Sequence, residues 1–153
     1  ILAFLPGEAG IRRCAELLEG NLGGTRIFPL DGMLPKEEQR GALAPNRPGE
    51  RKGVLATSIA ETSLTSEGVR VGVDSGLCRK MIFDRRNGMS HLETVRISID
   101  MADQRSGRAG RTAPGVCYRL WTAGTMQRMQ ACRTPEISDC DLAPLRLDIA
   151  AWV

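Results

Sequence analysis

Short apolar runs alternate with amphipathic stretches through the first half of the chain. Each run is five or six residues long and stops at proline, glycine or polar residues, as buried strands do. The runs cover residues 1–5, 26–30, 53–57 and 69–74. Residues 8–19 have helical spacing and end at Gly20, and residues 34–40 begin a second helix with proline in its first turn. This alternation predicts an α/β fold of the doubly wound class, in which helices cover both faces of a mostly parallel sheet.

The alternation breaks after residue 80, where the pattern predicts a protruding β-hairpin. Residues 81–84 and 92–97 flank Asn87-Gly88, a strong short-range hairpin signal. Arms of five or six residues give a ribbon about 17–20 Å long. Because an isolated ribbon is marginally stable in water, it either leans on another domain or extends the sheet of this one.

The last third of the chain predicts one more strand and one more helix. Residues 116–121 form an apolar run, and apolar positions recur at helical spacing through residues 142–152. Pro144 fits that helix only near its start.

The composition is that of one globular domain. The chain has 153 residues, of which 42% are hydrophobic and 25% are charged. No run approaches the roughly 18 apolar residues of a membrane span, so we expect no membrane association. The net charge of +3 is too small to indicate nucleic-acid binding by itself. Neither end looks like a natural terminus, since the chain opens on Ile1 and closes on Val153; we expect a fragment of a longer chain.

The five cysteines are scattered and include no C-x-x-C pair, and His91 has no metal-ligand neighbours in the sequence. This pattern favours reduced, mostly structural thiols, no bound metal and a cytoplasmic location.

The most informative stretch is residues 104–111, Gln-Arg-Ser-Gly-Arg-Ala-Gly-Arg. On a helix, the spacing of Arg105, Arg108 and Arg111 would place all three on one side. Each interior glycine costs a helix about 1 kcal/mol, so the two glycines need a reason, such as close approach of a backbone or ligand. Since arginine binds phosphate bidentately, the stretch predicts an arginine cluster presented to a polyphosphate from a helix end. The alternative is a solvated basic face, which would favour lysine, glutamate and alanine.

A second stretch, residues 56–68, follows a predicted strand, at the sheet edge where open α/β sheets bind ligands. Its hydroxyl groups, together with free backbone amides, are suited to holding phosphate oxygens without reading sequence. Those hydroxyls belong to Thr57, Ser58, Thr62, Ser63 and Thr65. The alternative is helix capping, because Thr57 or Ser58 with Glu61 resembles a capping box.

Together, these stretches resemble the second RecA-like lobe of a DEAH-box (DEAH/RHA) superfamily 2 helicase, most like the bacterial HrpB branch. Residues 56–65 resemble motif V, residues 104–111 resemble motif VI (Q-R-x-G-R-x-G-R), and residues 1–7 look like motif IV. The resemblance covers essentially the whole chain. It implies one RecA-like lobe over residues 1–153, with the hairpin at about 80–97 and the start of a following helical region at about 136–153.

The resemblance also implies roles for single residues. Gln104, Arg108 and Arg111 would reach the phosphates of the nucleotide, with the two arginines as arginine fingers and Arg105 mainly structural. Ser63 would sense the nucleotide, and Glu67, where the family usually has aspartate, would lie near the ribose or the metal shell. Residues expected to contact the nucleic-acid backbone are Gly7, Thr57, Ser58, Thr62 and Thr65. Ser58 replaces the usual asparagine, and Ala42 lies about where many relatives place an aromatic that stacks on adenine, so base selectivity should be weak.

The sequence contains neither G-x-x-x-x-G-K-[ST] nor Asp-Glu-Ala-His. ATP (or another NTP) with Mg²⁺ would therefore need an N-terminal RecA-like lobe of the same chain. The expected function is the C-terminal lobe of an ATP-dependent helicase acting on RNA or single-stranded nucleic acid, assembled with that lobe and with further C-terminal domains. The fragment alone should be inactive. Two alternatives are a catalytically inactive RecA-like binding module and a metabolic α/β enzyme, although no nucleophile–base set supports the latter.

Overall fold

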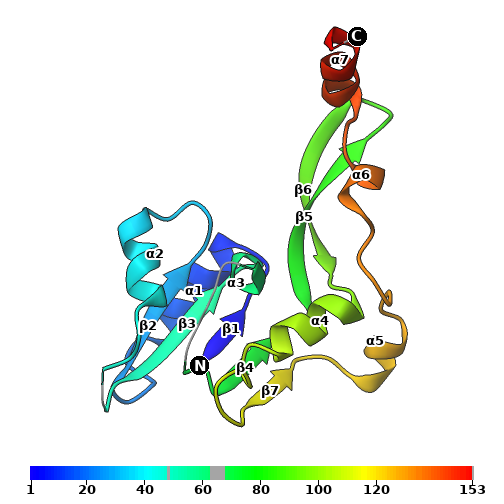
Figure 1. The fold of residues 1–153 in the computed structure, drawn as a ribbon. Coiled ribbons are helices and arrows are strands. Elements are labelled where there is room, and N and C mark those ends of the chain that lie inside the picture. The colour runs from blue at the N-terminus through cyan, green and yellow to red at the C-terminus, as the bar shows by residue number, and fades with distance from the viewer. Residues whose placement is uncertain (48, 63–67, 153) are drawn as a thin grey trace.

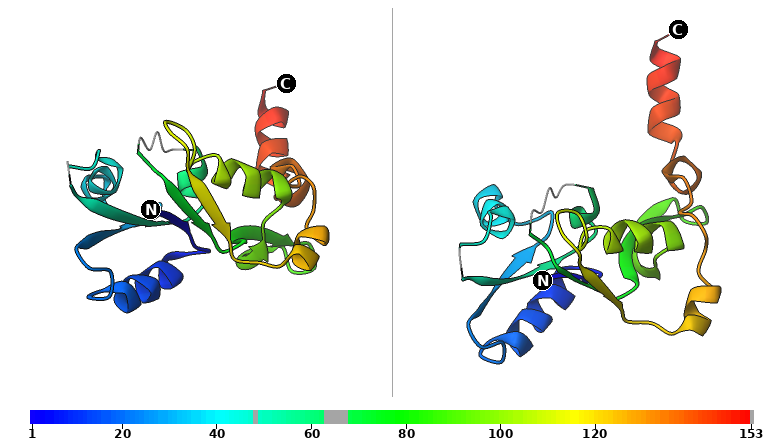
Figure 2. Two further views of the ribbon diagram at one scale, coloured as in Figure 1. Left: turned by 90° about the horizontal axis from the view of Figure 1, so that it is seen from below. Right: turned by 60° about the horizontal axis from the view of Figure 1, so that its bottom comes forward.

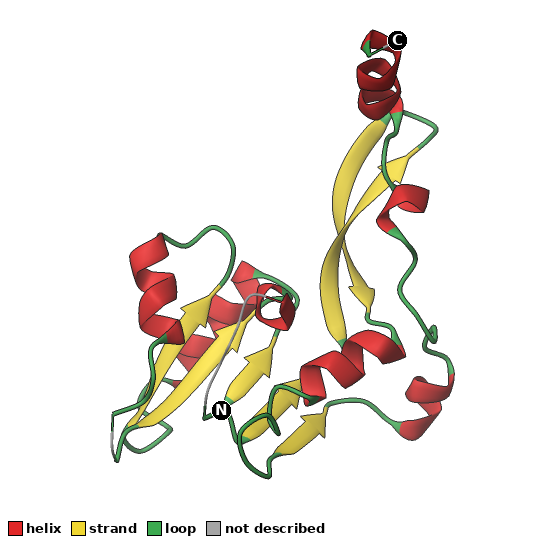
Figure 3. Cartoon of the chain, in the orientation of Figure 1, coloured by secondary structure: helices red, strands yellow, loops and turns green. Residues whose placement is uncertain are grey.

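The computed structural model describes residues 1–47, 49–62 and 68–152, the side chain of Thr62 excepted. A five-stranded parallel sheet forms its centre (Figures 1 and 3). The strands are β1 (Leu2–Phe4), β2 (Thr25–Leu30), β3 (Arg51–Ala56), β4 (Val71–Asp74) and β7 (Val116–Arg119). Their order is β2-β3-β1-β4-β7, so the short apolar runs β1 and β3 lie in the interior of the sheet. The predicted parallel sheet is confirmed.

Helices cover both faces of this sheet, as the alternating pattern predicted. Helix α1 (Glu8–Leu18) lies on one face, and α2 (Lys36–Leu43), α3 (Ile59–Thr62) and α4 (Ile99–Ser106) lie on the other (Figure 2). Helix α2 begins after Pro35, which is its N-cap residue, so the proline precedes the first turn in which it was predicted to lie. The architecture is therefore doubly wound.

The main hydrophobic core lies between the sheet and α2. It includes Leu2, Phe4, Leu30 and Val54, each at most 7% exposed. Ala42 belongs to the same core and is 5% exposed. Its helix turns this residue inward against the sheet, and the expected weak base selectivity stays a prediction.

The hairpin projects away from the sheet and is longer than predicted (Figure 1). Strands β5 (Leu77–Asp84) and β6 (Met89–Arg96) pair in antiparallel register over eight residues each. The four residues 85–88 connect them, with Gly88 at a φ of 69°. At about 3.4 Å per residue the ribbon is about 27 Å long, against the predicted 17–20 Å.

A second hydrophobic cluster holds the base of the hairpin to α4. Cys78 and Ile97 pack with Ala102 of α4 and with Met129. Burial raises the pKa of the Cys78 thiol. All five cysteines are free thiols.

Three short helices follow β7: α5 (Ala123–Gln127), α6 (Glu136–Asp139) and α7 (Ala143–Ala151). An ion pair between Lys80 and Asp139 joins α6 to the hairpin. The predicted final helix is present as α7, with Pro144 in its first turn. None of the helices formed by residues 1–47, 49–62 and 68–152 has the length and apolar character needed to cross a membrane.

Candidate nucleotide and nucleic-acid site

The arginine-rich stretch spans the end of a helix. Helix α4 ends at Ser106. The backbone then forms a turn with two hydrogen bonds between residues three apart, from Arg108 N to Arg105 O and from Ala109 N to Ser106 O (both 3.1 Å). The prediction that Arg105, Arg108 and Arg111 share one helical side is wrong. Gly107 and Gly110 weaken helical continuation, so only Arg105 is helical. The other two are presented from the turn beyond the helix end.

Arg105 points into the protein and is completely buried. Its Nε donates to Glu61 at 2.7 Å, and its Nη1 donates to Asp74 at 2.8 Å and to the carbonyl oxygen of Leu77 at 3.2 Å. Its guanidinium also lies 5.0 Å from the centre of the Phe4 ring. These contacts join α4 to α3, β4 and the first strand of the hairpin, which agrees with the structural role implied for Arg105.

Arg108 joins the two motifs directly. Its Nη2 donates to the backbone carbonyl oxygen of Glu61, in the stretch that resembles motif V. Burial, followed by repulsion from Arg111, lowers the pKa of Arg108, and Glu61 partly opposes this. Arg111 is exposed. Because two guanidinium groups close enough to repel one another favour a shared anion, Arg108 and Arg111 suit a polyphosphate.

Gln104 lies on α4, away from this arginine pair. Its Oε1 accepts from Nη2 of Arg133 at 2.9 Å, and Arg133 also forms an ion pair with Asp100 at 3.0 Å. Among the described residues, Gln104 makes no hydrogen bond to Arg108 or Arg111. A role for Gln104 at the phosphates stays a prediction.

Thr57 and Ser58 follow β3, as predicted, with Thr57 half-buried and Ser58 exposed. The capping box does not form, because the Glu61 carboxylate is 3% exposed and bound by Arg105. Backbone hydrogen bonds between residues three apart form the first turn of α3 instead, from Ala60 N to Thr57 O and from Glu61 N to Ser58 O. The predicted roles of Ser63, Thr65 and Glu67 lie outside the described residues, as does the side chain of Thr62.

Gly7 follows β1 and precedes α1, so it lies at the same edge of the sheet as Thr57 and Ser58. A Cβ atom at Gly7 would lie 2.8 Å from Cδ of Arg79, in the hairpin. The structure thus brings the motif IV and motif V positions together, with an arginine of the hairpin beside them.

Sequence reasoning missed the two buried carboxylates that hold Arg105. Glu61 follows the apolar pair Ile59-Ala60, and Asp74 ends an apolar strand. A charge within an apolar segment was the available signal, because a buried carboxylate needs a partner.

The described part of the chain holds no group of three or more His, Cys, Asp or Glu side chains suited to a metal ion. The described residues that fit a nucleotide are two cations, Arg108 and Arg111, because guanidinium groups bind phosphate oxygens.

Comparison with known proteins places the chain in a family. Residues 1–113 match the family of the helicase conserved C-terminal domain. The ATP-dependent RNA helicase HrpB of Escherichia coli (strain K12) is 42% identical over 153 residues, covering 99% of this chain and 19% of that protein. The chloroplastic ATP-dependent RNA helicase DEAH12 of Arabidopsis thaliana is 43% identical over 138 residues, 90% of this chain and 8% of that protein.

A crystal structure of the Escherichia coli DEAH/RHA helicase HrpB matches with a TM-score of 0.92 and 43% identity, over 99% of this chain and 19% of that one. This likeness confirms the predicted RecA-like fold. The chain spans about a fifth of the length of HrpB.

Proposed function

Because the chain belongs to the family of helicase conserved C-terminal domains, we propose that it is the C-terminal RecA-like lobe of an ATP-dependent RNA helicase. The observation that carries the proposal is the junction of the two motifs: Arg108 donates to the backbone of Glu61 while lying close enough to Arg111 for their charges to repel. Both relatives named above are ATP-dependent RNA helicases, which favours RNA as the nucleic acid.

Arg108 and Arg111 act as arginine fingers in this proposal. Bound ATP or another NTP, with Mg²⁺, supplies the phosphoryl group, and an N-terminal lobe supplies the rest of the phosphate site. The two guanidinium groups bind phosphate oxygens and stabilise the negative charge that develops on them during transfer. Arg105 keeps the turn in place, because its buried ion pairs fix the end of α4.

Thr57, Ser58 and Gly7 hold the sugar–phosphate backbone of the RNA in this proposal. Contacts of this kind carry no sequence information, as a translocating enzyme requires. Helix α3 follows Ser58 directly, and its residue Glu61 accepts the hydrogen bond from Arg108. A shift of α3 therefore moves both the nucleic-acid and the nucleotide contacts. Further domains of the same chain complete the assembly, and we propose the cytoplasm as its compartment because the cysteines are free thiols.

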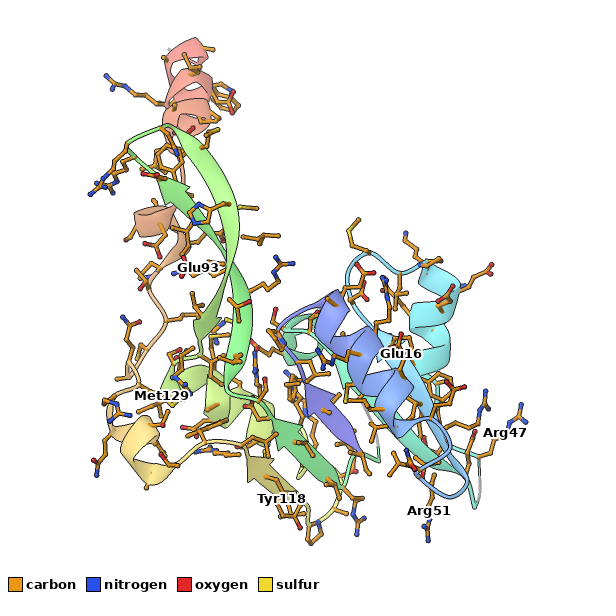
Figure 4. The ribbon with its side chains drawn as sticks, turned by 180° about the vertical axis from the view of Figure 1, so that it is seen from behind. Glu16, Arg47, Arg51, Glu93, Tyr118 and Met129 are labelled. Carbon is orange, nitrogen blue, oxygen red and sulfur yellow. The ribbon has the colours of Figure 1, made fainter. Side chains whose placement is uncertain are left out.

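The test is to replace Arg108 or Arg111 by alanine in the full-length protein. We expect turnover to fall by about 10³–10⁵, because arginine fingers act on transition-state charge, and nucleotide affinity to change much less. Steady-state hydrolysis and equilibrium binding of a fluorescent nucleotide give the two quantities. The matched control is Arg51→Ala, since Arg51 is exposed where β3 begins, far from the motifs (Figure 4).

Near-normal turnover in either variant would contradict the arginine-finger role. If the wild-type full-length protein does not hydrolyse NTP at all, the inactive binding module is the better description.

A further inference from the structure

The hairpin joins the sheet through a junction of two residues, Ser75 and Gly76, between β4 and β5. Gly76 has a φ of 72°, a left-handed conformation that glycine adopts without strain. Its N–H donates to Oδ1 of Asp74 at 2.9 Å, and its carbonyl oxygen accepts from the backbone N–H of Ile97 at 3.1 Å. Because Asp74 ends β4 and Ile97 follows β6, Gly76 fixes the point at which both strands of the ribbon leave the sheet.

An indole ring packs against this glycine. From the position that a Cβ atom at Gly76 would take, Cε3 of Trp121 lies at 2.7 Å and Cζ3 at 3.1 Å, so a methyl group there would displace the ring. Trp121 comes two residues after β7 and also packs against the second hydrophobic cluster, which contains Cys78 and Ile97. The ring therefore contacts both the junction and the cluster at the base of the hairpin.

Helix α4 reaches the junction by two routes. The first is Arg105, whose Nη1 donates to Oδ1 of Asp74, the same oxygen that accepts from Gly76. Nη1 of Arg105 also donates to the carbonyl oxygen of Leu77, the first residue of β5. This route connects the start of the ribbon to α4.

The second route runs through the indole ring. Asp103 of α4 forms an ion pair with Arg119 at 2.7 Å, and the Arg119 guanidinium lies 5.8 Å from the centre of the Trp121 ring, at the distance of a cation–π contact. Helix α4 lies at the base of the hairpin, beside β4 and β7 (Figure 1). Since both routes end at Gly76, the direction of the ribbon is fixed relative to the helix that leads to the proposed arginine fingers.

We propose that Trp121 is a positioning residue for strand separation, because its ring, packed against Gly76, holds the ribbon at a fixed angle to α4. The proposal rests on the proposed function, since it concerns how a movement of the lobe reaches the ribbon. Trp121 contacts neither the nucleotide nor the nucleic acid in this account and acts only through the ribbon. Without the ring, the junction is a glycine with open space beside it, and the ribbon follows the lobe less closely.

The informative variant is Trp121→Leu in the full-length protein, because leucine fills part of the apolar space but leaves Gly76 without the ring. Hydrogen exchange measured by mass spectrometry reports on the junction through peptides that cover residues 74–79 and 95–99. We expect exchange there to become about tenfold faster, the scale of one lost aromatic contact, while a peptide from β3 is unchanged. The number of base pairs separated per phosphate released should fall by a similar factor, with kcat and KM for NTP hydrolysis unaltered.

The matched control is Tyr118→Leu, which removes an aromatic side chain of β7 that is 57% exposed and should change neither quantity (Figure 4). Trp121→Phe keeps a ring beside Gly76 and should recover most of both. A second variant, Gly76→Ala, leaves Trp121 in the sequence but places a methyl group where the ring lies, so it should act like Trp121→Leu. Thermal melting of each variant shows that the fold is kept.

Unchanged exchange at the junction in Trp121→Leu and Gly76→Ala would overturn this inference, as would faster exchange with an unchanged ratio of base pairs to phosphate. Equal losses in Tyr118→Leu would overturn it too. In all three cases the proposed function stands, because the wild type still hydrolyses NTP and separates strands. A wild type that does neither would overturn the proposed function and, with it, the role of Trp121 in strand separation.

Discussion

Arg105 is a fully buried cation held between the buried carboxylates of Glu61 and Asp74. Two of the polar atoms in this cluster, Nη2 of Arg105 and Oδ2 of Asp74, have no hydrogen-bond partner among the described residues. Desolvating such a cluster is costly, so its net contribution to stability is small compared with the cost of breaking it.

We expect Arg105→Met to lower the free energy of unfolding by about 3–5 kcal/mol, because it leaves Glu61 and Asp74 buried without a counter-ion. Urea denaturation measures the change. The control is Arg12→Met, which breaks the exposed pair with Glu8 and should cost less than about 1 kcal/mol. Equal losses in the two variants would show that Arg105 does not hold the lobe together.

The family resemblance implied a mainly structural role for Arg105, and its burial agrees with that role, but the spacing of the arginines alone does not separate it from Arg108 and Arg111. The three-residue spacing is the same between Arg105 and Arg108 as between Arg108 and Arg111, yet one side chain is buried and another is exposed. The division depends on where α4 ends and on Glu61 and Asp74, which come from α3 and β4. Such long-range pairing has no local signal. The burial of Ala42 likewise depends on how α2 packs on the sheet.

The side chains of the hairpin are packed at its base and exposed farther out. Near the base, Cys78 and Ile97 pack against α4, whereas Met81, Met89 and Leu92 farther out are 49–63% exposed. An exposed two-stranded ribbon is marginally stable alone, and apolar side chains on it suit contact with another domain or with nucleic acid.

We expect that shortening the hairpin separates hydrolysis from strand separation. Residues 81–92 are replaced by the turn Asn-Gly, which keeps the Lys80–Glu93 pair and the base below it. In the full-length protein, nucleic-acid-stimulated hydrolysis should stay largely intact, since the motifs remain. Unwinding should fall sharply, because the ribbon would no longer reach the duplex junction. Both rates are measured on one preparation that melts cooperatively; unchanged unwinding would mean that the ribbon is only structural.

At the scale of elements, prediction succeeded where burial is periodic. The apolar runs became β1–β4, and residues 8–19 became α1 almost without change. The hairpin arms were underestimated because polar residues such as Arg79 and Ser90 interrupt the apolar pattern, although backbone pairing continues through them. Helices α5 and α6 were missed because four or five residues are too few to show a period.

Across the whole molecule, α4 separates the two contacts that we propose, one to a nucleotide and one to nucleic acid. The turn beyond Ser106 carries the arginines for a nucleotide, and a cavity near Ser98 is bordered by Ser58. Helix α3 contacts the arginine-rich stretch through Glu61, which binds Arg105 by its carboxylate and Arg108 by its carbonyl oxygen, and it begins directly after Thr57 and Ser58. In the proposed function, α3 transmits a movement of Thr57 and Ser58 to Arg108.

The same arrangement limits what the lobe does alone. We expect the isolated chain of 153 residues to fold, since it has a buried hydrophobic core and a five-stranded parallel sheet, but to show no NTP hydrolysis. Its residues include the two proposed arginine fingers but no Walker A loop and no Asp-Glu-Ala-His, so nothing in the sequence supplies the remaining phosphate site. Thermal melting tests folding, and phosphate release is compared between the chain and its Arg108→Ala variant.

Turnover that Arg108→Ala leaves unchanged would show either a contaminant or a complete site elsewhere in the chain. Turnover that the variant abolishes would show that one lobe suffices, and the two-lobe account would then be wrong.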